Sequence, residues 1–202
     1  MPKVGAIILA AGMSIRMGEP KLLLPLRGQP LFRHAIDSIL GSSMQPIYLV
    51  AGKYIEEIRQ HSEDYPGLKI IHNPNYADGM STSLKLGVQS IKENVDAVMI
   101  FLADQPLISR DVIQALIEKY IECKDDGVRI VRPKYKGEAG HPILVDAVIL
   151  KEFHSIEGDQ GGKSIIQKYD AMTETVSFDN SMWGFDIDTP EDFLKVKLHL
   201  KS

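Results

Sequence analysis

Apolar segments of strand length alternate along this chain with segments of helical pattern, and this alternation limits the fold more than any other feature. The predicted strands are residues 3–9, 46–50, 68–71 and 97–102. The predicted helices are residues 31–40, 54–62, 81–91, 109–121 and 190–200. Such alternation is typical of a parallel sheet with helices on both faces. We therefore predict an α/β fold, a three-layer αβα sandwich built on a Rossmann-like, mainly parallel sheet.

The chain is of a size that suits one domain. Its 202 residues can bury a sizeable core, and no segment resembles a linker between two cores. The predicted C-terminal helix has the clearest start, because Thr189 can cap it, Pro190 occupies its first position and Asp192 follows three residues after the cap. We expect a single domain over residues 1–202.

Composition limits the classes of partner. The net charge of −4 argues against a nucleic acid, because nucleic-acid surfaces must neutralise many phosphates. A single cysteine, Cys123, excludes an internal disulfide and a cysteine zinc site. The first apolar run is too short for a membrane span or a signal peptide. We therefore expect a cytoplasmic protein with a small-molecule substrate and no membrane partner.

The loop after the first predicted strand has the composition of a nucleotide site. Its small residues leave backbone N–H groups free to approach phosphates, and Arg16 and Lys21 add positive charge that suits a polyphosphate. The Walker and dinucleotide-binding patterns are absent. The alternative is an ordinary strand-to-loop junction with a solvated cation. The residues of this candidate loop are Leu9, Ala10, Ala11 and Gly12.

Three aspartates are candidates for a metal or substrate site. Asp104 follows the strand at residues 97–102, so it is expected at the same sheet edge as Arg16 and Lys21. Asp186 and Asp188 precede the last helix, where Asp188 also has a purely structural explanation at the helix N-terminus. Mg²⁺ is usually held by one or two carboxylates together with phosphate oxygens and water. We predict Mg²⁺ on Asp104 and Asp186, while the choice between Asp186 and Asp188 stays open.

Several segments together resemble one known family. They are the loop at residues 9–21, Leu-Ala-Asp-Gln-Pro at 102–106 and Asp-Ile-Asp-Thr-Pro-Glu-Asp at 186–192, with further agreement at 79–84, 140–142 and 158–162. This set resembles the molybdenum-cofactor nucleotidyltransferases, within the GT-A-like sugar nucleotidylyltransferase fold. The resemblance covers nearly the whole chain and implies that fold.

The resemblance is closest to the cytidylyl-transferring members, which join CMP from CTP to molybdopterin and release pyrophosphate. The guanylyl-transferring relatives typically have two glycines where this chain has Ala11 and Gly12, so the resemblance favours CTP. It also implies nucleotide contacts from Ser81 and Ser83, which could otherwise be helix caps. The resemblance makes His141 a candidate contact of the acceptor. Asp188 is a second candidate contact, in addition to its possible role at the helix N-terminus.

The chemistry needs few groups if the acceptor is a phosphate monoester. Its oxygen is already anionic at neutral pH, so no general base is required. Mg²⁺ on Asp104 and Asp186, with Arg16 and Lys21, would position the reactants and stabilise the charge that develops on the leaving pyrophosphate. We therefore predict Arg16, Lys21 and Asp104 as the catalytic residues.

Two other functions remain open at this point. The first is a cytidylyl or uridylyl transferase that acts on a sugar or polyol phosphate. The second is a non-catalytic carrier that protects the molybdenum cofactor for a client molybdoenzyme, such as one of purine breakdown. A separate expectation concerns residues 129–136, whose alternating Arg and Lys side chains indicate a solvated edge strand.

Overall fold

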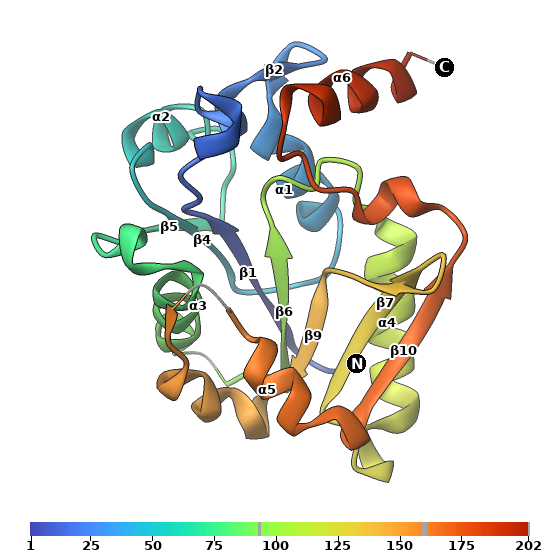
Figure 1. The fold of residues 1–202 in the computed structure, drawn as a ribbon. Helices are drawn as coiled ribbons and strands as arrows, with labels where there is room; N and C mark the ends of the chain where they lie inside the picture. Colours follow the sequence, from blue (N-terminus) through green and yellow to red (C-terminus); the bar gives the residue numbers. More distant parts are fainter. Residues whose placement is uncertain (93, 159–160, 202) are drawn as a thin grey trace.

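The computed structural model describes residues 1–92, 94–158 and 161–201, and within these ranges one large sheet contains eight strands (Figure 1). Its strand order is β10-β7-β9-β6-β1-β4-β5, with β8 paired to β7. A separate hairpin joins β2 (Pro25–Leu26) and β3 (Gln29–Pro30). The strands of the large sheet are β1 (Val4–Ala10), β4 (Ile47–Ala51), β5 (Leu68–His72), β6 (Ala97–Leu102), β7 (Ile130–Tyr135), β8 (Glu138–Ala139), β9 (Ile143–Asp146) and β10 (Thr173–Phe178).

The sheet is mixed but mostly parallel, as the sequence predicts. β1 pairs in parallel with β4 and β6, and β4 with β5, while β7 and β10 form a second parallel pair. β9 lies between these halves and runs antiparallel to both β6 and β7. One reversed strand therefore leaves the carboxyl ends of β1, β6 and β7 at the same edge of the sheet.

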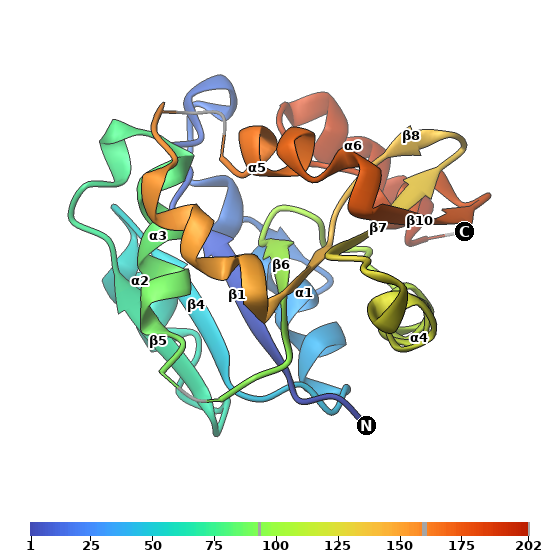
Figure 2. The same cartoon turned by 90° about the horizontal axis from the view of Figure 1, so that it is seen from below.

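Helices cover both faces of the sheet, which confirms the predicted three layers (Figure 2). Within the described residues, no helix has the length and apolar character needed to cross a membrane. The α-helices are α1 (Leu31–Leu40), α2 (Ile55–Gln60), α3 (Met80–Ser90), α4 (Arg110–Cys123), α5 (Lys163–Lys168) and α6 (Pro190–His199). The 3₁₀ segments used below are η1 (Ile15–Met17), η2 (Lys21–Leu23), η4 (Lys124–Asp126) and η5 (Ala147–Ser155).

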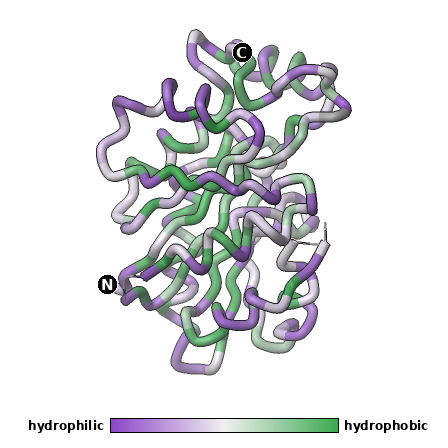
Figure 3. The backbone as a smooth tube through the Cα atoms, turned by 90° about the vertical axis from the view of Figure 1, so that its left-hand side faces the viewer, coloured by the Kyte–Doolittle hydropathy of each residue, from purple (hydrophilic) through white to green (hydrophobic). Residues whose placement is uncertain are grey.

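Two hydrophobic cores lie on opposite faces of the sheet because side chains alternate along each strand. Ile8 of β1 packs in the core that contains Phe32 of α1. Its neighbour Ile7 packs in the other core, with Leu84 of α3 and Phe153 of η5. The central strands β1, β4 and β6 are buried on both faces, so they form hydrophobic stretches of the tube in Figure 3.

The end of the chain is fixed by the predicted helix cap. The Thr189 hydroxyl accepts a hydrogen bond from the Asp192 backbone N–H at 3.2 Å. The Asp192 carboxylate accepts one in return from the Thr189 backbone N–H at 2.9 Å, which completes a capping box. This cap sets the position of Asp188, immediately before it.

The predicted solvated edge strand at residues 129–136 is wrong. β7 is an inner strand with β9 on one side and β10 on the other, and its Arg132 and Lys134 are only partly exposed. The sequence patterns did not predict either neighbouring strand, β9 or β10. β9 has only four residues and β10 reads Thr-Glu-Thr-Val-Ser-Phe, so both lack the long apolar run that marks a buried strand.

Close packing of α3 on β1 generates a stability prediction. A Cβ atom at Gly87 would lie 2.7 Å from Cγ2 of Ile7. Gly87→Ala should lower the free energy of unfolding by about 1 kcal/mol, because overpacking costs about 1–3 kcal/mol and outweighs the helix-propensity gain of about 1 kcal/mol. Denaturant unfolding measures this. Gln89→Ala, on the exposed side of α3, is the control, and a Gly87→Ala protein more stable than wild type would contradict the packing.

Candidate active site

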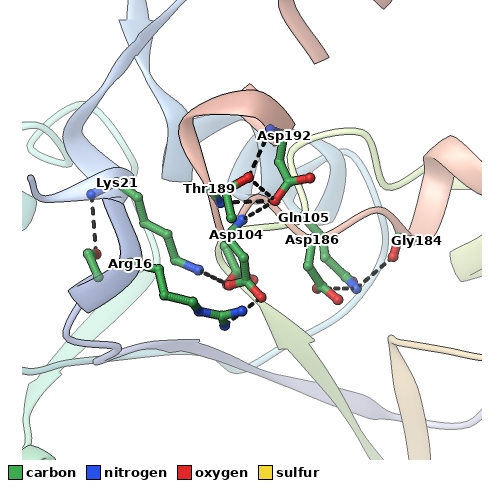
Figure 4. Close-up of polar contacts among 10 residues, drawn as sticks. Arg16, Lys21, Asp104, Gln105, Gly184, Asp186, Thr189 and Asp192 are labelled. Carbon is green, nitrogen blue, oxygen red and sulfur yellow. Dashed lines mark hydrogen bonds and ion pairs between the residues drawn. The ribbon is translucent and has the colours of Figure 1, made fainter. Parts of the chain in front are cut away.

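Three segments that are distant in sequence meet at the carboxyl edge of the sheet. They are the loop after β1, the turn after β6 and the chain that leads into α6 (Figures 1 and 4). Backbone bonds join them, since Ala103 N–H donates to the Leu9 carbonyl at 3.0 Å and Ile187 N–H to the Asp104 carbonyl at 3.1 Å. A cavity of about 310 Å³ opens between them. Its lining includes Leu9, Ala10, Gly12, Arg16, Lys21, Asp104 and Asp188.

Lys21 is the centre of a charged cluster in this cavity. Its Nζ donates to Oδ2 of Asp104 at 2.6 Å and to Oδ1 of Asp188 at 2.9 Å. Burial opposes the lysine charge, but Asp104 and Asp188 outweigh it and raise the pKa of Lys21. Lys21 is 8% exposed and therefore holds a fixed positive charge at the bottom of the cavity.

Arg16 extends the same cluster toward solvent. Its Nη2 donates to Oδ2 of Asp188 at 2.7 Å, and its side chain is 68% exposed. Burial acts to raise the pKa of Asp188, but Lys21 and Arg16 together lower it. Asp188 is therefore ionised, and it pairs with both the buried Lys21 and the exposed Arg16. The predicted proximity of Arg16, Lys21 and Asp104 is found in the structure.

Asp186 lies on the other side of Asp104. Its Oδ1 accepts a hydrogen bond from Nε2 of Gln105 at 2.8 Å, and the same Nε2 donates to the Gly184 carbonyl at 3.1 Å (Figure 4). Burial raises the pKa of Asp186 to about 6, with the neighbouring Asp104 carboxylate as the second cause. A carboxylate destabilised in this way gains from a nearby cation.

The donor set fits a divalent cation. Oδ1 of Asp104 is buried and has no hydrogen-bond partner among the described residues, although buried carboxylate oxygens are normally paired. The Asp186 carboxylate is near enough to Asp104 for the two charges to interact, so it could offer a second oxygen. No group of three or more His, Cys, Asp or Glu side chains in the described ranges could hold a metal. Two carboxylates suit Mg²⁺, which takes its remaining ligands from phosphates and water.

A second cavity of about 240 Å³ lies between the loop after β1 and the start of α3. Ala11, Gly12, Gly79 and Ser83 line it, and Asp104 borders both cavities. Gly79, with a φ of 105°, occupies a conformation that favours glycine, and its backbone begins the helix.

The two serines of α3 are not caps. The N-cap position is Gly79 and makes no side-chain hydrogen bond. Ser83 accepts a hydrogen bond from Nδ2 of Asn73 at 2.8 Å and borders the cavity. The buried Ser81 hydroxyl has no partner in the described part of the chain. Nucleotide contacts from Ser81 and Ser83 stay predictions.

The predicted acceptor residues separate in the structure. Asp188 lines the cavity of the cations. His141 instead borders a cavity of about 460 Å³ together with Gln105, Tyr135 and Asp186. Burial and the Arg132 charge lower the pKa of His141 to about 4, so its imidazole is neutral at pH 7. An acceptor role for either residue stays a prediction.

Three residues near the site were missed in the sequence. Gln105 was part of a recognised motif but carried no predicted role, although its amide holds Asp186. Tyr135, which donates to the His141 carbonyl at 2.8 Å, and Arg132 belong to the strand that was predicted to be a solvated edge. Asp159 and Gln160 of the motif at residues 158–162 lie outside the described residues.

The sheet, the glycine-containing loop and the cluster of cations and carboxylates at its edge together define the nucleotidyltransferase class of site. Comparison with known sequences supports the same class, because the MobA-like NTP transferase domain matches residues 6–173. The chain belongs to the MobA-like NTP transferase family.

Alignments with individual relatives cover nearly the whole chain. It is 29% identical to the molybdenum cofactor cytidylyltransferase of Escherichia coli (strain K12), covering 98% of this chain and 97% of that protein. It is 25% identical to the nicotine blue oxidoreductase of Paenarthrobacter nicotinovorans, with 97% of each chain covered. A solved nucleotidyl transferase from Methanothermobacter thermautotroptrophicus has the same fold, with a TM-score of 0.83, 20% identity and 98% of each chain covered.

The raised pKa of Asp186 generates a pH prediction for metal-free protein. An unfolded aspartate titrates near 3.8 and the folded Asp186 near 6, so its contribution to stability is present below pH 4 and is lost as the pH rises through 6. Asp186→Asn should therefore gain stability relative to wild type between pH 4 and pH 7. Denaturant unfolding in EDTA checks this, with the exposed Asp179→Asn as control. A constant difference across that range would contradict the buried carboxylate.

Proposed function

We propose that this nucleotidyltransferase transfers CMP from CTP to molybdopterin, releases pyrophosphate and requires Mg²⁺. The observation that carries this proposal is the buried Lys21 between Asp104 and Asp188, beside the loop that the sequence predicts as the nucleotide site. The 29% identity to a molybdenum cofactor cytidylyltransferase over nearly the full length supports the choice of nucleotide and acceptor.

The triphosphate lies along the cavity of the cations. Lys21 and Arg16 exchange their carboxylate partners for phosphate oxygens, and the loop N–H groups approach the same phosphates. Mg²⁺ held by Asp104 and Asp186 would neutralise charge on the phosphates. Lys21 remains protonated, so it stabilises the negative charge that grows on the departing pyrophosphate.

The acceptor phosphate reaches the reacting phosphorus from the side of Asp186. Its oxygen is anionic at neutral pH, so the protein needs to position it rather than remove a proton. Gln105 keeps the Asp186 carboxylate in place through its 2.8 Å hydrogen bond. His141 borders the same cavity and contacts the acceptor, while Asp188 orients Arg16 and Lys21 and lies near enough to the phosphates to contact the acceptor as well.

The base of CTP occupies the cavity beside α3. Ala11 and Ser83 line it, and the methyl group of Ala11 stands where the guanylyl-transferring relatives have a second glycine. One methyl group discriminates ligands by about 1–3 kcal/mol, which is enough for a preference for CTP over GTP.

The wider setting follows from the same proposal. One catalytic domain over residues 1–202 delivers its product to a client molybdoenzyme and has no nucleic-acid or membrane partner. The cytoplasmic location expected from the sequence stays a prediction.

The first test is pyrophosphate release by the purified chain with molybdopterin and Mg²⁺, comparing CTP, GTP, ATP and UTP. CTP should be preferred, and Asp104→Asn should lower the rate at least about 100-fold, because it removes charge from the metal site. The control is Asp126→Asn, an exposed residue at the end of η4.

The other outcomes separate the alternatives. Release with CTP and a sugar or polyol phosphate, but not with molybdopterin, would assign the chain to the other acceptor class. Molybdopterin binding without pyrophosphate release from any nucleotide would indicate a carrier. Preference for GTP would contradict the argument from Ala11.

Lys21 should contribute more to the rate than to nucleotide binding. Lys21→Gln is expected to lower kcat about 100-fold or more while the Kd for CTP rises less, because the charge that Lys21 contacts grows in the transition state. Single-turnover kinetics and equilibrium CTP binding separate the two effects. Lys53→Gln, an exposed residue between β4 and α2, is the control. Equal losses in kcat and in affinity would assign Lys21 to ground-state binding only.

A further inference from the structure

A separate cavity of about 290 Å³ lies between the sheet and the helices of one face. Ile100 of β6 and Ile143 and Val145 of β9 line it from the sheet. Leu84 of α3 and Phe153 of η5 line it from the helical layer, so most of its surface is apolar. A cavity of this size and lining is typical of a site for a small ligand with a largely apolar surface.

One cation with a buried donor atom borders this cavity without a full set of partners. Nη2 of Arg132 donates to the Gly140 carbonyl at a long 3.3 Å, and Nε is buried with no partner in the described part of the chain. Burial lowers the pKa of Arg132 below its ordinary value. A buried guanidinium donor without an acceptor is costly and needs an explanation.

Two further polar side chains, His141 and the exposed Lys163, line the cavity. Burial and the nearby Arg132 lower the pKa of His141 to about 4, so the imidazole is neutral and Arg132 supplies the charge on this wall. A neutral imidazole can donate or accept a hydrogen bond. The cavity therefore combines apolar walls with a cationic donor and a neutral polar ring.

The cavity adjoins the reaction site on two sides. Leu9 and Met80 border it and also both nucleotide cavities. His141 borders it and also the cavity of Gln105 and Asp186. A ligand in the apolar cavity can therefore extend a phosphate arm to the metal site while the nucleotide is bound.

We propose that this cavity binds the ring system of the acceptor, a planar heterocycle whose carbonyl oxygen accepts a hydrogen bond from Nε of Arg132. The proposal rests on the proposed function and specifies which part of the acceptor is recognised. The ring, and not only the phosphate, is then a determinant of acceptor selection.

The direct test uses a ring without a phosphate, 6-hydroxymethylpterin, added to the full chain without nucleotide or metal. Wild type should bind it, with a change in pterin fluorescence. Arg132→Gln should weaken binding at least about 10-fold, since a hydrogen bond to a charged donor is lost. Lys134→Gln is the matched control, because it removes a cation two residues along the same strand that does not line the cavity.

A second variant tests the space itself. Ile166→Trp adds volume at a partly exposed position of the lining in α5 and should abolish pterin binding. Both variants should keep wild-type CTP affinity and thermal stability, and with molybdopterin as substrate they should raise KM for the acceptor but not for CTP. Loss of CTP binding together with pterin binding would reduce Arg132 to a structural role and overturn the proposal.

The outcomes distinguish the two proposals. Suppose that wild type releases pyrophosphate from CTP with molybdopterin. If it then fails to bind the pterin, or if wild type and Arg132→Gln bind the pterin equally well, the ring site is wrong and the proposed function stands. If the pterin binds in a way that depends on Arg132 but no nucleotide is turned over, the ring site stands and the proposed function fails.

Discussion

The contact on which the site depends is the pairing of one buried lysine with two carboxylates from distant parts of the chain. Lys21 reaches Asp104, 83 residues later, and Asp188, 167 residues later. Its Nζ is largely desolvated, and the two carboxylates beside it offset that cost and raise the pKa of Lys21. The same contact ties the loop after β1 to the turn after β6 and to the segment before α6. The position of the C-terminal segment and the geometry of the site therefore depend on the same contact.

The sheet explains why these segments meet. β1 and β6 are parallel neighbours, so the loops that follow them leave the same edge, where Leu9 and Ala103 are joined by a backbone hydrogen bond. The reversed strand β9 begins at this edge instead of ending there. His141 therefore lies just before a strand and beside the carboxyl end of β6. The reversal thus brings His141 next to Gln105 and Asp186, around one cavity.

The sequence predicted the part of this arrangement that depends on local pattern. Alternating apolar runs located β1, β4, β5 and β6 to within a residue or two, and the capping residues located the start of α6. The rule that ligands gather at strand carboxyl ends then brought Arg16, Lys21 and Asp104 together without any structure. The half that contains β9 and β10 was not predictable in this way, because its strands are short or polar. Arg132 was misassigned for the same reason: its environment is created by its neighbours β9 and β10, which the local sequence does not reveal.

The charge balance of the site determines how it accepts a nucleotide. Two cations, Arg16 and Lys21, face three carboxylates, and the high pKa of Asp186 shows that the third negative charge is already unfavourable. A bare triphosphate would add several more negative charges to a cavity in which carboxylates already outnumber cations. In the proposed complex, its phosphates would displace Asp188 from Lys21 and Arg16, and a divalent cation would neutralise Asp104 and Asp186. The unpaired Oδ1 of Asp104 lies where such a cation would be held.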